Sequence, residues 1–230
     1  MNNNHMRRIE EELEKIAGEI KVCKKCPLHT NRVNAVPGEG NYSHGIILIG
    51  EAPGVNEDLQ GKPFVGAAGK LLDELMGDVG LYRGTVYITN VVKCRPPGNR
   101  QPKDDEVKMC TSLYLDRQIA IINPKLIVCL GNISSKYIFS KYGLKFKSMS
   151  EAHGKIHRII SLHGELKIIA TYHPAAILRN PKIIEEAKID WKTIGEAIKS
   201  ICKRGGSLTV ISQNLINALK PDYHGLILKP

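Results

Sequence analysis

The chain lacks any apolar run near the roughly 20 residues that a membrane-spanning helix needs. Its opening stretch, MNNNHMRRIEEELEK, has neither the hydrophobic segment nor the cleavage pattern of a secretory signal peptide. The sequence also contains no internal repeat and no low-complexity tract. These absences argue against a membrane protein, a secreted protein and a repeat array. We therefore expect a cytoplasmic protein, or a nuclear one if the host has a nucleus, with no membrane partner.

Aromatic side chains are scarce, at 5% of the 230 residues, with three Phe and one Trp. Apolar residues still make up 42%, which is enough for one sizeable core. The segment KRGGS (203–207) has the composition typical of a domain boundary. We therefore expect one domain, residues 1–204, and a short C-terminal tail, residues 205–230.

Acidic residues are outnumbered. There are 23 Asp and Glu against 33 Lys and Arg, which gives a net charge of +10. Such an excess favours polyanionic partners, because each neutralised phosphate releases counterions. Many proteins are merely basic, so the charge by itself is only a modest indication of nucleic-acid binding.

Four short apolar runs are typical of strands that are buried on both faces. Segments with apolar residues at helical spacing lie between them, and this alternation predicts an α/β protein with helices on both faces of a mostly parallel four-stranded sheet. Residues 144–165 alternate in polarity and predict an added hairpin. The predicted strands are 44–50, 84–90, 125–131 and 166–174, and helices are expected over 6–22, 67–80, from 104, after Gly131 and over 183–201.

Unusual loops follow three of these predicted strands. In open parallel sheets, ligands bind beyond the carboxyl ends of the strands, so three such loops predict one shared site. The first loop, GEAPG, lacks the Lys and Ser/Thr of a phosphate-binding P-loop. Its turn exposes backbone N–H groups that could bind a carbonyl oxygen, although an ordinary turn explains it equally well. The loops are GEAPG (50–54), NVVKCRPPGNRQP (90–102) and HPAAILRNP (173–181).

Single residues in and near these loops have a plain and a functional interpretation. Phe64 is either a core aromatic or a platform on which a planar ligand stacks. Asn90 either caps a turn or reads a base edge, since its amide offers a donor and an acceptor together. His173 is, taken alone, better explained as a loop histidine without function. The apolar residues before Arg179 suit a wedge beside a phosphate-binding arginine.

The six cysteines are not expected to form disulfides in a cytosolic chain. A CxxC pair near the N-terminus needs two further ligands to complete a four-coordinate site. Spacing alone leaves zinc and an iron–sulfur cluster both open. Cys129 lies inside a predicted strand and is interpreted as a small buried hydrophobe, and Cys202 is expected to be unliganded. The selected ligands are Cys23, Cys26, Cys94 and Cys110.

Together these stretches resemble family 4 uracil-DNA glycosylases, the iron–sulfur group found in bacteria and archaea. The resemblance covers roughly residues 7–204, and the last 26 residues fall outside it. It implies a uracil-DNA glycosylase-like three-layer α/β/α domain and a [4Fe–4S] cluster with a structural role, held by the four selected cysteines. The stretches are GEAPG, Glu57–Asp58, GKPFVGAAGKLLD, YITNVVKCRPPGNRQP and HPAAILR.

The resemblance also implies an activity. A monofunctional DNA glycosylase of base excision repair would extrude uracil from single- or double-stranded DNA, hydrolyse its N-glycosidic bond and leave an abasic site. Phe64 would stack on the uracil and Asn90 would pair with its edge. His173 would donate a hydrogen bond to the oxygen that becomes negative as the bond breaks. Backbone groups at Gly50, Glu51 and Ala52 would contact the ring carbonyls.

Other implied roles concern water, thymine and DNA. Ala52 occupies the position at which family 1 enzymes carry a water-positioning Asp, so no general base is evident and Glu51 is the nearest carboxylate. Glu57 is expected to line the side where a thymine methyl would clash. Leu178 and Arg179 are expected to contact DNA, with Ile177 as the alternative wedge. Covalent trapping through a histidine is not expected, because VVKCRPPGNRQPKDD contains none.

Two rival functions stay open at this point. One is a related glycosylase for other deaminated bases, hypoxanthine or xanthine. The other is a non-catalytic nucleic-acid-binding protein with a structural zinc. We further expect a monomer, and QNLINAL (213–219) faintly resembles a sliding-clamp motif without its aromatic pair.

Overall fold

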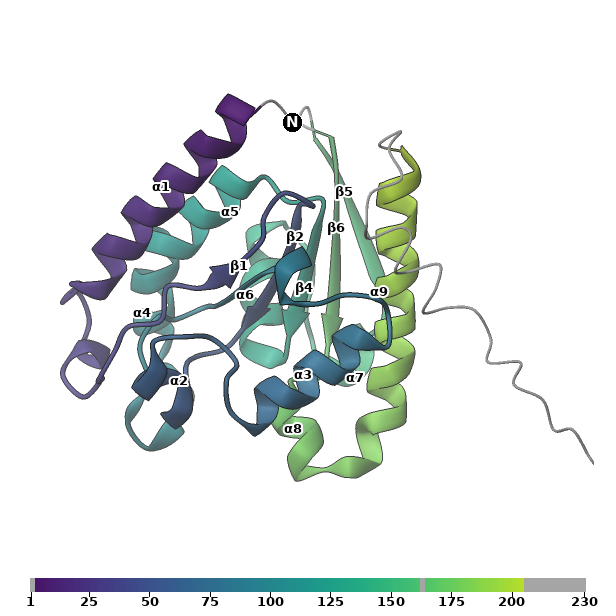
Figure 1. Cartoon of the computed structure of the whole chain (residues 1–230). Coiled ribbons are helices and arrows are strands. Elements are labelled where there is room, and N and C mark those ends of the chain that lie inside the picture. The colour runs from purple at the N-terminus through teal and green to yellow at the C-terminus, as the bar shows by residue number, and fades with distance from the viewer. Residues whose placement is uncertain (1–2, 162–163, 205–230) are drawn as a thin grey trace, which may run out of the picture.

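The computed structural model of the chain describes residues 3–161 and 164–204 (Figure 1). The expected tail, with its clamp-like segment, lies outside the described residues. The helices are α1 (Asn3–Lys21), α2 (Val55–Gln60), α3 (Ala67–Gly77), α4 (Asp104–Cys110), α5 (Asp116–Ile122), α6 (Asn132–Lys141), α7 (Met149–Ala152), α8 (Pro174–Arg179) and α9 (Ile184–Arg204). The strands are β1 (Glu39–Gly40), β2 (Ile46–Gly50), β3 (Tyr87–Asn90), β4 (Leu126–Leu130), β5 (Ile156–Ser161) and β6 (Gly164–Thr171).

The strands form one sheet in the order β1-β3-β2-β4-β6-β5. The inner four, β3, β2, β4 and β6, run parallel, which confirms the predicted parallel core. Two antiparallel edge strands extend it to six, because β1 pairs with β3 and β5 pairs with β6. The β5–β6 pair is the expected hairpin, although α7, within the same predicted segment, is helical.

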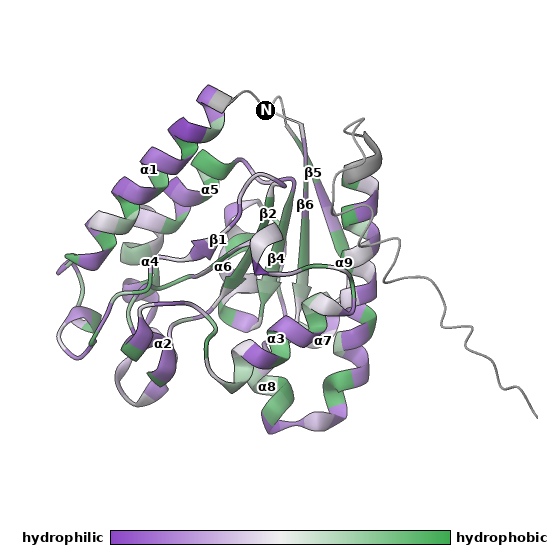
Figure 2. Ribbon diagram, in the orientation of Figure 1, coloured by the Kyte–Doolittle hydropathy of each residue, from purple (hydrophilic) through white to green (hydrophobic). Residues whose placement is uncertain are grey.

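Helices cover both faces of the sheet, as the apolar strands require (Figure 1). Alternate residues of β2 pack into two separate cores: Ile47 and Ile49 join α1, α5 and α6, whereas Ile46 and Leu48 join α3 and α9. In Figure 2 the apolar sides of α1 and α9 face inward from opposite flanks of the sheet. This double burial explains why β2 is an unbroken apolar run and confirms the three-layer α/β/α architecture.

The carboxyl ends of the parallel strands meet at one edge of the sheet. Gly50 at the end of β2 pairs with Asn90 at the end of β3, and Leu130 at the end of β4 pairs with Thr171 at the end of β6. The chain passes through α3 on one face between β2 and β3, and through α4 and α5 on the other face between β3 and β4. This change of face at β3 places a crevice beyond the strand ends, where α/β proteins bind ligands.

A buried polar network fastens α9 to β6 just before the last loop of this edge. The Asp190 carboxylate is 2.8 Å from His153 Nδ1 and accepts a 2.8 Å hydrogen bond from the Thr171 hydroxyl. Asp190 is buried, and burial raises the pKa of its carboxyl group. The network fixes the backbone that leads into His173.

None of the helices in the described ranges has the length and apolarity to cross a membrane.

Candidate active site

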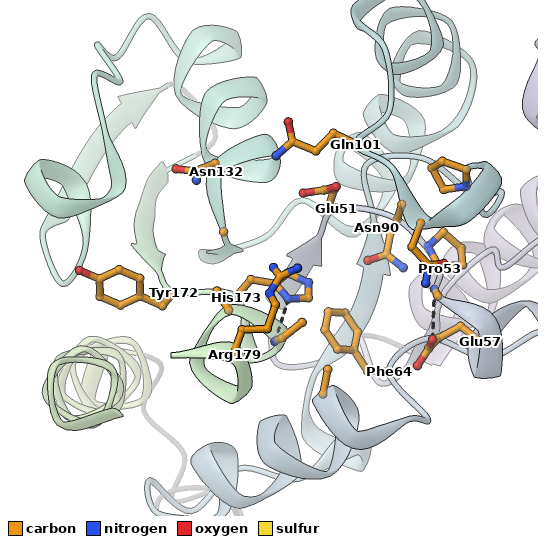
Figure 3. Close-up of a pocket in the computed structure, with 18 of the residues that line it drawn as sticks. Glu51, Pro53, Glu57, Phe64, Asn90, Gln101, Asn132, Tyr172, His173 and Arg179 are labelled. Carbon is orange, nitrogen blue, oxygen red and sulfur yellow. Dashed lines mark hydrogen bonds between the residues drawn. The ribbon is translucent and has the colours of Figure 1, made fainter. Parts of the chain in front are cut away.

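A cavity of about 620 Å³ opens beyond the carboxyl ends of β2, β3, β4 and β6. Its size falls within the range of small-molecule pockets. Figure 3 shows side chains from several elements converging on it. The predicted site residues that line this cavity are Glu51, Ala52, Glu57, Phe64, Asn90, His173 and Arg179.

Gly50 lies beneath the cavity, between two of these side chains. A methyl group at position 50 would stand 2.4 Å from Asn90 Oδ1 and 2.6 Å from Phe64 Cζ. Only a residue without a side chain therefore lets the amide and the ring approach each other. Asn90 is buried, and its Oδ1 atom has no hydrogen-bond partner among the described residues. Since buried polar atoms are nearly always hydrogen-bonded, Oδ1 marks a place for a ligand donor.

Phe64 forms one side of the cavity in an unusual backbone conformation. Its φ of 52° lies in the left-handed region, which bulky residues rarely adopt. The ring is largely buried and stacks near His173, with ring centroids 5.6 Å apart and planes inclined by 29° (Figure 3). Strain of this kind persists where the surroundings over-determine a conformation, and such places cluster at functional sites.

His173 precedes α8 and caps its first turn. Its Nδ1 accepts a 3.1 Å hydrogen bond from the Ala175 backbone N–H. In the neutral imidazole the proton must then reside on Nε2. No hydrogen bond among the described residues uses Nε2, so this N–H is free to donate to a ligand.

The charge state of His173 follows from its surroundings. Burial, followed by the positive charge of Arg179, lowers the pKa of its imidazole to about 4. The ring is therefore neutral near pH 7. Gly131, at a φ of 92°, allows this placement, because a methyl group there would lie 2.8 Å from His173 Cβ.

Two carboxylates in the cavity have different surroundings. Burial raises the pKa of Glu51, and the charge of Arg179 opposes that rise. Glu57 instead accepts three backbone hydrogen bonds: from Val65 and Gly66 at 2.8 and 2.9 Å, and from Gly54 at 3.1 Å. Glu57 thus joins the GEAPG loop to the loop of Phe64, a contact that sequence reasoning missed.

The residues of α8 divide between core and surface. Ile177 is only 3% exposed and belongs to the core between the sheet and α9, whereas Leu178 is 48% exposed. Leu178 does not line the cavity, but it stands next to Arg179, which does. Of the two wedge residues considered from sequence, only Leu178 is free to contact a partner.

Sequence reasoning overlooked one wall of the cavity. Gly131 and Asn132 follow β4, and Tyr172 precedes His173. Gln101 lies in loop 90–102, which was predicted to contribute to the site, although this residue was not singled out. The signal for Gly131 and Asn132 was available, since they follow the third buried strand at the same edge as the other loops.

The four selected cysteines line a second, smaller cavity on the α1 side of the sheet. Cys23 follows α1 and Cys26 precedes a short turn, so both come from the N-terminal loop. Cys94 follows β3, and Cys110 ends α4 where a π-helical turn, Thr111–Leu115, begins. Cys129 lies in β4, is fully buried and does not line this cavity. The side chain of Cys202 lies outside the part of the chain that the structure describes.

Hydrogen-bond donors surround the sulfur atoms. Arg32 Nη1 donates to Cys94 Sγ at 2.9 Å, and the Lys93 backbone N–H donates to Cys110 Sγ at 3.3 Å. Such donors stabilise thiolates, the form in which cysteine binds metals. Burial raises the pKa of the Cys94 and Cys110 thiols, so binding a metal group would have to displace their protons.

Comparisons with known proteins agree with this geometry. Residues 37–193 match the family model described as the uracil DNA glycosylase superfamily. A type-4 uracil-DNA glycosylase of Sulfurisphaera tokodaii is 54% identical over 80% of this chain and 84% of that protein. One from Archaeoglobus fulgidus is 50% identical over 81% and 93%, and one from Thermotoga maritima is 43% identical over 86% and 98%. The chain belongs to the uracil-DNA glycosylase superfamily and, within it, to the type-4 uracil-DNA glycosylases.

Proposed function

We propose that this protein is a monofunctional uracil-DNA glycosylase that removes uracil from DNA in base excision repair. Type-4 relatives that align along most of their length support the assignment. The observation that carries it is the buried Asn90 Oδ1: it has no hydrogen-bond partner in the described part of the chain, and it shares the cavity with the rings of Phe64 and His173.

Uracil satisfies that site by its donor and acceptor pattern. Its N3–H donates to Asn90 Oδ1, and its O4 accepts from the Asn90 amide nitrogen. Cytosine presents an acceptor at N3 and a donor at N4, so both contacts fail. A site that leaves buried polar groups unpaired rejects a ligand strongly. The Phe64 ring supplies the stacking surface for the extruded base.

The bond between the sugar C1′ and uracil N1 breaks first, which leaves a cationic sugar and a uracil anion. His173 donates from Nε2 to the uracil O2, where negative charge develops. We place the ring carbonyls against backbone groups of Glu51 and Ala52, which line the cavity, and of the preceding Gly50, and these groups add to this stabilisation. The proton stays on Nε2 because Nδ1 is held as an acceptor.

The lining residues also support hydrolysis without a covalent enzyme intermediate. No lysine or cysteine is among the residues described around the large cavity, so no amine is available to form a Schiff base with the sugar. Water therefore adds to the cationic C1′ through its oxygen; it gives up one proton to solvent, and the uracil anion takes up one proton to leave as neutral uracil. We assign to the Glu51 carboxylate the electrostatic stabilisation of the cationic sugar.

The end of α8 binds the DNA on either side of the extruded nucleotide. Leu178 enters the gap left by the extruded nucleotide, and Arg179 binds a flanking phosphate. Glu57 lines the cavity on the side of the GEAPG loop, where we place the exclusion of the thymine methyl group.

We further propose that Cys23, Cys26, Cys94 and Cys110 hold a [4Fe–4S] cluster. They surround one cavity, yet no group of three or more His, Cys, Asp or Glu side chains in the described ranges could hold a single metal ion. A cluster gives each thiolate its own iron and so needs more widely spaced sulfurs than one zinc ion with bonds of about 2.3 Å. The cluster would tie α1 to the loop that follows Asn90.

The test is release of free uracil. A uracil-containing oligonucleotide is incubated with the protein, abasic sites are cleaved with alkali, and the base is identified by chromatography. We expect uracil and a shortened strand, with His173→Ala and Asn90→Ala folded but roughly 100- to 1000-fold slower. Ordinary rates in both variants would contradict the site assignment. Oligonucleotides that carry hypoxanthine or xanthine are incubated in parallel; release of those bases with uracil left in place would favour the related glycosylase. A colourless, inactive zinc protein would favour the binding protein.

A further inference from the structure

Arg83 lies just before β3 and uses every donor it has. A guanidinium group carries five N–H bonds. Nε donates to Asp73 Oδ1 at 2.9 Å, and Nη2 donates to Asp73 Oδ2 at 3.3 Å and to the Phe64 carbonyl oxygen. Nη1 donates to the Pro63 carbonyl at 3.0 Å and to Glu39 Oε1 at 3.3 Å. Two of the five donors thus hold the backbone of the Phe64 loop.

The saturation of Arg83 excludes the simplest role for an arginine in a DNA-binding protein. No N–H remains for a phosphate oxygen, and the carboxylates of Asp73 and Glu39 already outnumber its single charge. Arg83 also does not line the large cavity. Its hydrogen bonds are directed at the protein itself.

The loop that Arg83 holds is confined from other directions too. A methyl group at Gly69 would stand 1.8 Å from the Phe64 carbonyl oxygen, so that oxygen lies directly against α3. Glu57 holds the two N–H groups that follow Phe64. These contacts together enforce the left-handed φ of 52° at Phe64, which would otherwise relax toward the common regions.

We propose that Arg83 is a positioning residue for base recognition: it holds Phe64 in its left-handed conformation, so that the aromatic platform exists before the base enters. The proposal rests on the proposed function, because it assigns Phe64 to an extruded uracil. Arg83 lies just before β3 and Asn90 is its last residue, so one short segment both holds the platform and carries the edge-reading amide.

A preformed platform has a recognisable kinetic signature. The Phe64 ring stacks on the base both before and during bond cleavage, so it contributes uniform binding. In single-turnover uracil release, loss of Arg83 should therefore raise the half-saturating concentration, which is the protein concentration that gives half of the maximal rate. The maximal rate itself should stay nearly unchanged. Loss of His173, which acts on the departing base, should lower the maximal rate.

The experiment is single-turnover uracil release by the cluster-containing Arg83→Met protein. We expect a half-saturating concentration roughly ten-fold higher, as for loss of most of one base–aromatic stack. Binding of uracil-free DNA and its dependence on salt should not change. The matched control is Arg117→Met, whose arginine is also part-buried and pairs with Glu19 between α5 and α1; it does not line the large cavity. This control should match the wild type.

A double-mutant cycle shows whether Arg83 acts through Phe64. In a Phe64→Ala background, Arg83→Met should have almost no further effect on the half-saturating concentration. Additive effects would overturn the proposal. So would a lower affinity for uracil-free DNA with a shallower salt slope, which would make Arg83 a phosphate ligand.

A second variant covers a failure of Arg83→Met to fold. Gly69→Ala leaves Arg83 intact but displaces the Phe64 carbonyl, and it should give the same rise in half-saturating concentration; an unchanged value would overturn the proposal. Absence of uracil release by the wild type would instead contradict the proposed function, so the two failures remain distinguishable.

Discussion

Gly50 and Asn90 end neighbouring parallel strands in register, and a methyl group on Gly50 would lie 2.4 Å from Asn90 Oδ1. The edge-reading oxygen therefore rests directly on the backbone of β2. This contact turns the Asn90 amide toward the cavity and leaves no space for any larger residue beneath it.

Gly50→Ala should therefore damage base recognition selectively. The added methyl group displaces the Asn90 amide and the Phe64 ring, a cost of about 1–3 kcal/mol for overpacking. We expect the half-saturating concentration for uracil-DNA, measured in single turnover, to be roughly 10- to 100-fold higher. Gly77→Ala is the control, since a methyl group there meets no atom within 4 Å beyond its chain neighbours and the backbone of its own helix. Equal activity of Gly50→Ala and wild type would refute the tight contact.

The pH dependence should reflect a neutral His173. The pKa of its imidazole falls from 6.5 to about 4 in the folded protein, so the unfolded chain binds more protons between these values. The contribution of this residue to stability is therefore present above pH 6.5 and is lost as the pH falls toward 4. The single-turnover rate should show no histidine titration near pH 6.5. A fall in the single-turnover rate centred near pH 6.5, and absent in His173→Ala, would mean that the pKa of His173 is not lowered.

The cysteines should separate into ligands and a bystander. Cys110→Ala removes one cluster ligand and should abolish the brown colour and its absorbance near 400 nm, roughly where iron–sulfur clusters absorb. Cys129→Ala alters only a fully buried thiol in β4 and should keep the absorbance. Iron and sulfide content measured on both proteins checks the result. Loss of the band in Cys129→Ala alone would reverse the assignment.

Asp190 should matter more for stability than for chemistry. Asp190→Ala leaves His153 and Thr171 without their buried partner, which costs about 1–3 kcal/mol. Urea unfolding should show a lower midpoint. Glu185→Gln, which alters an exposed pair with Lys188, should stay within about 0.5 kcal/mol of wild type. An unchanged midpoint for Asp190→Ala would mean that the network contributes nothing.

Much of the fold could be predicted, because its central strands are buried on both faces and so read as unbroken apolar runs. β2 and β4 are such strands. The edges were harder. β1 has only two residues, too few for any pattern, and it pairs with β3, from which β2, α2 and α3 separate it along the chain.

The site divides in the same way. The loops that hold Asn90 and His173 could be placed together because parallel strands end at one edge. The contacts of Arg83 and Glu57 with the Phe64 loop could not be predicted. They join side chains to backbone groups of other loops, and no periodicity records such a contact.

The most direct test of the account is a crystal structure of the protein with uracil bound in the large cavity. The account predicts uracil N3 about 2.9 Å from Asn90 Oδ1, O2 within hydrogen-bond reach of His173 Nε2, and the ring stacked on Phe64. Uracil bound elsewhere, or in this cavity with Asn90 Oδ1 still unpartnered, would contradict it.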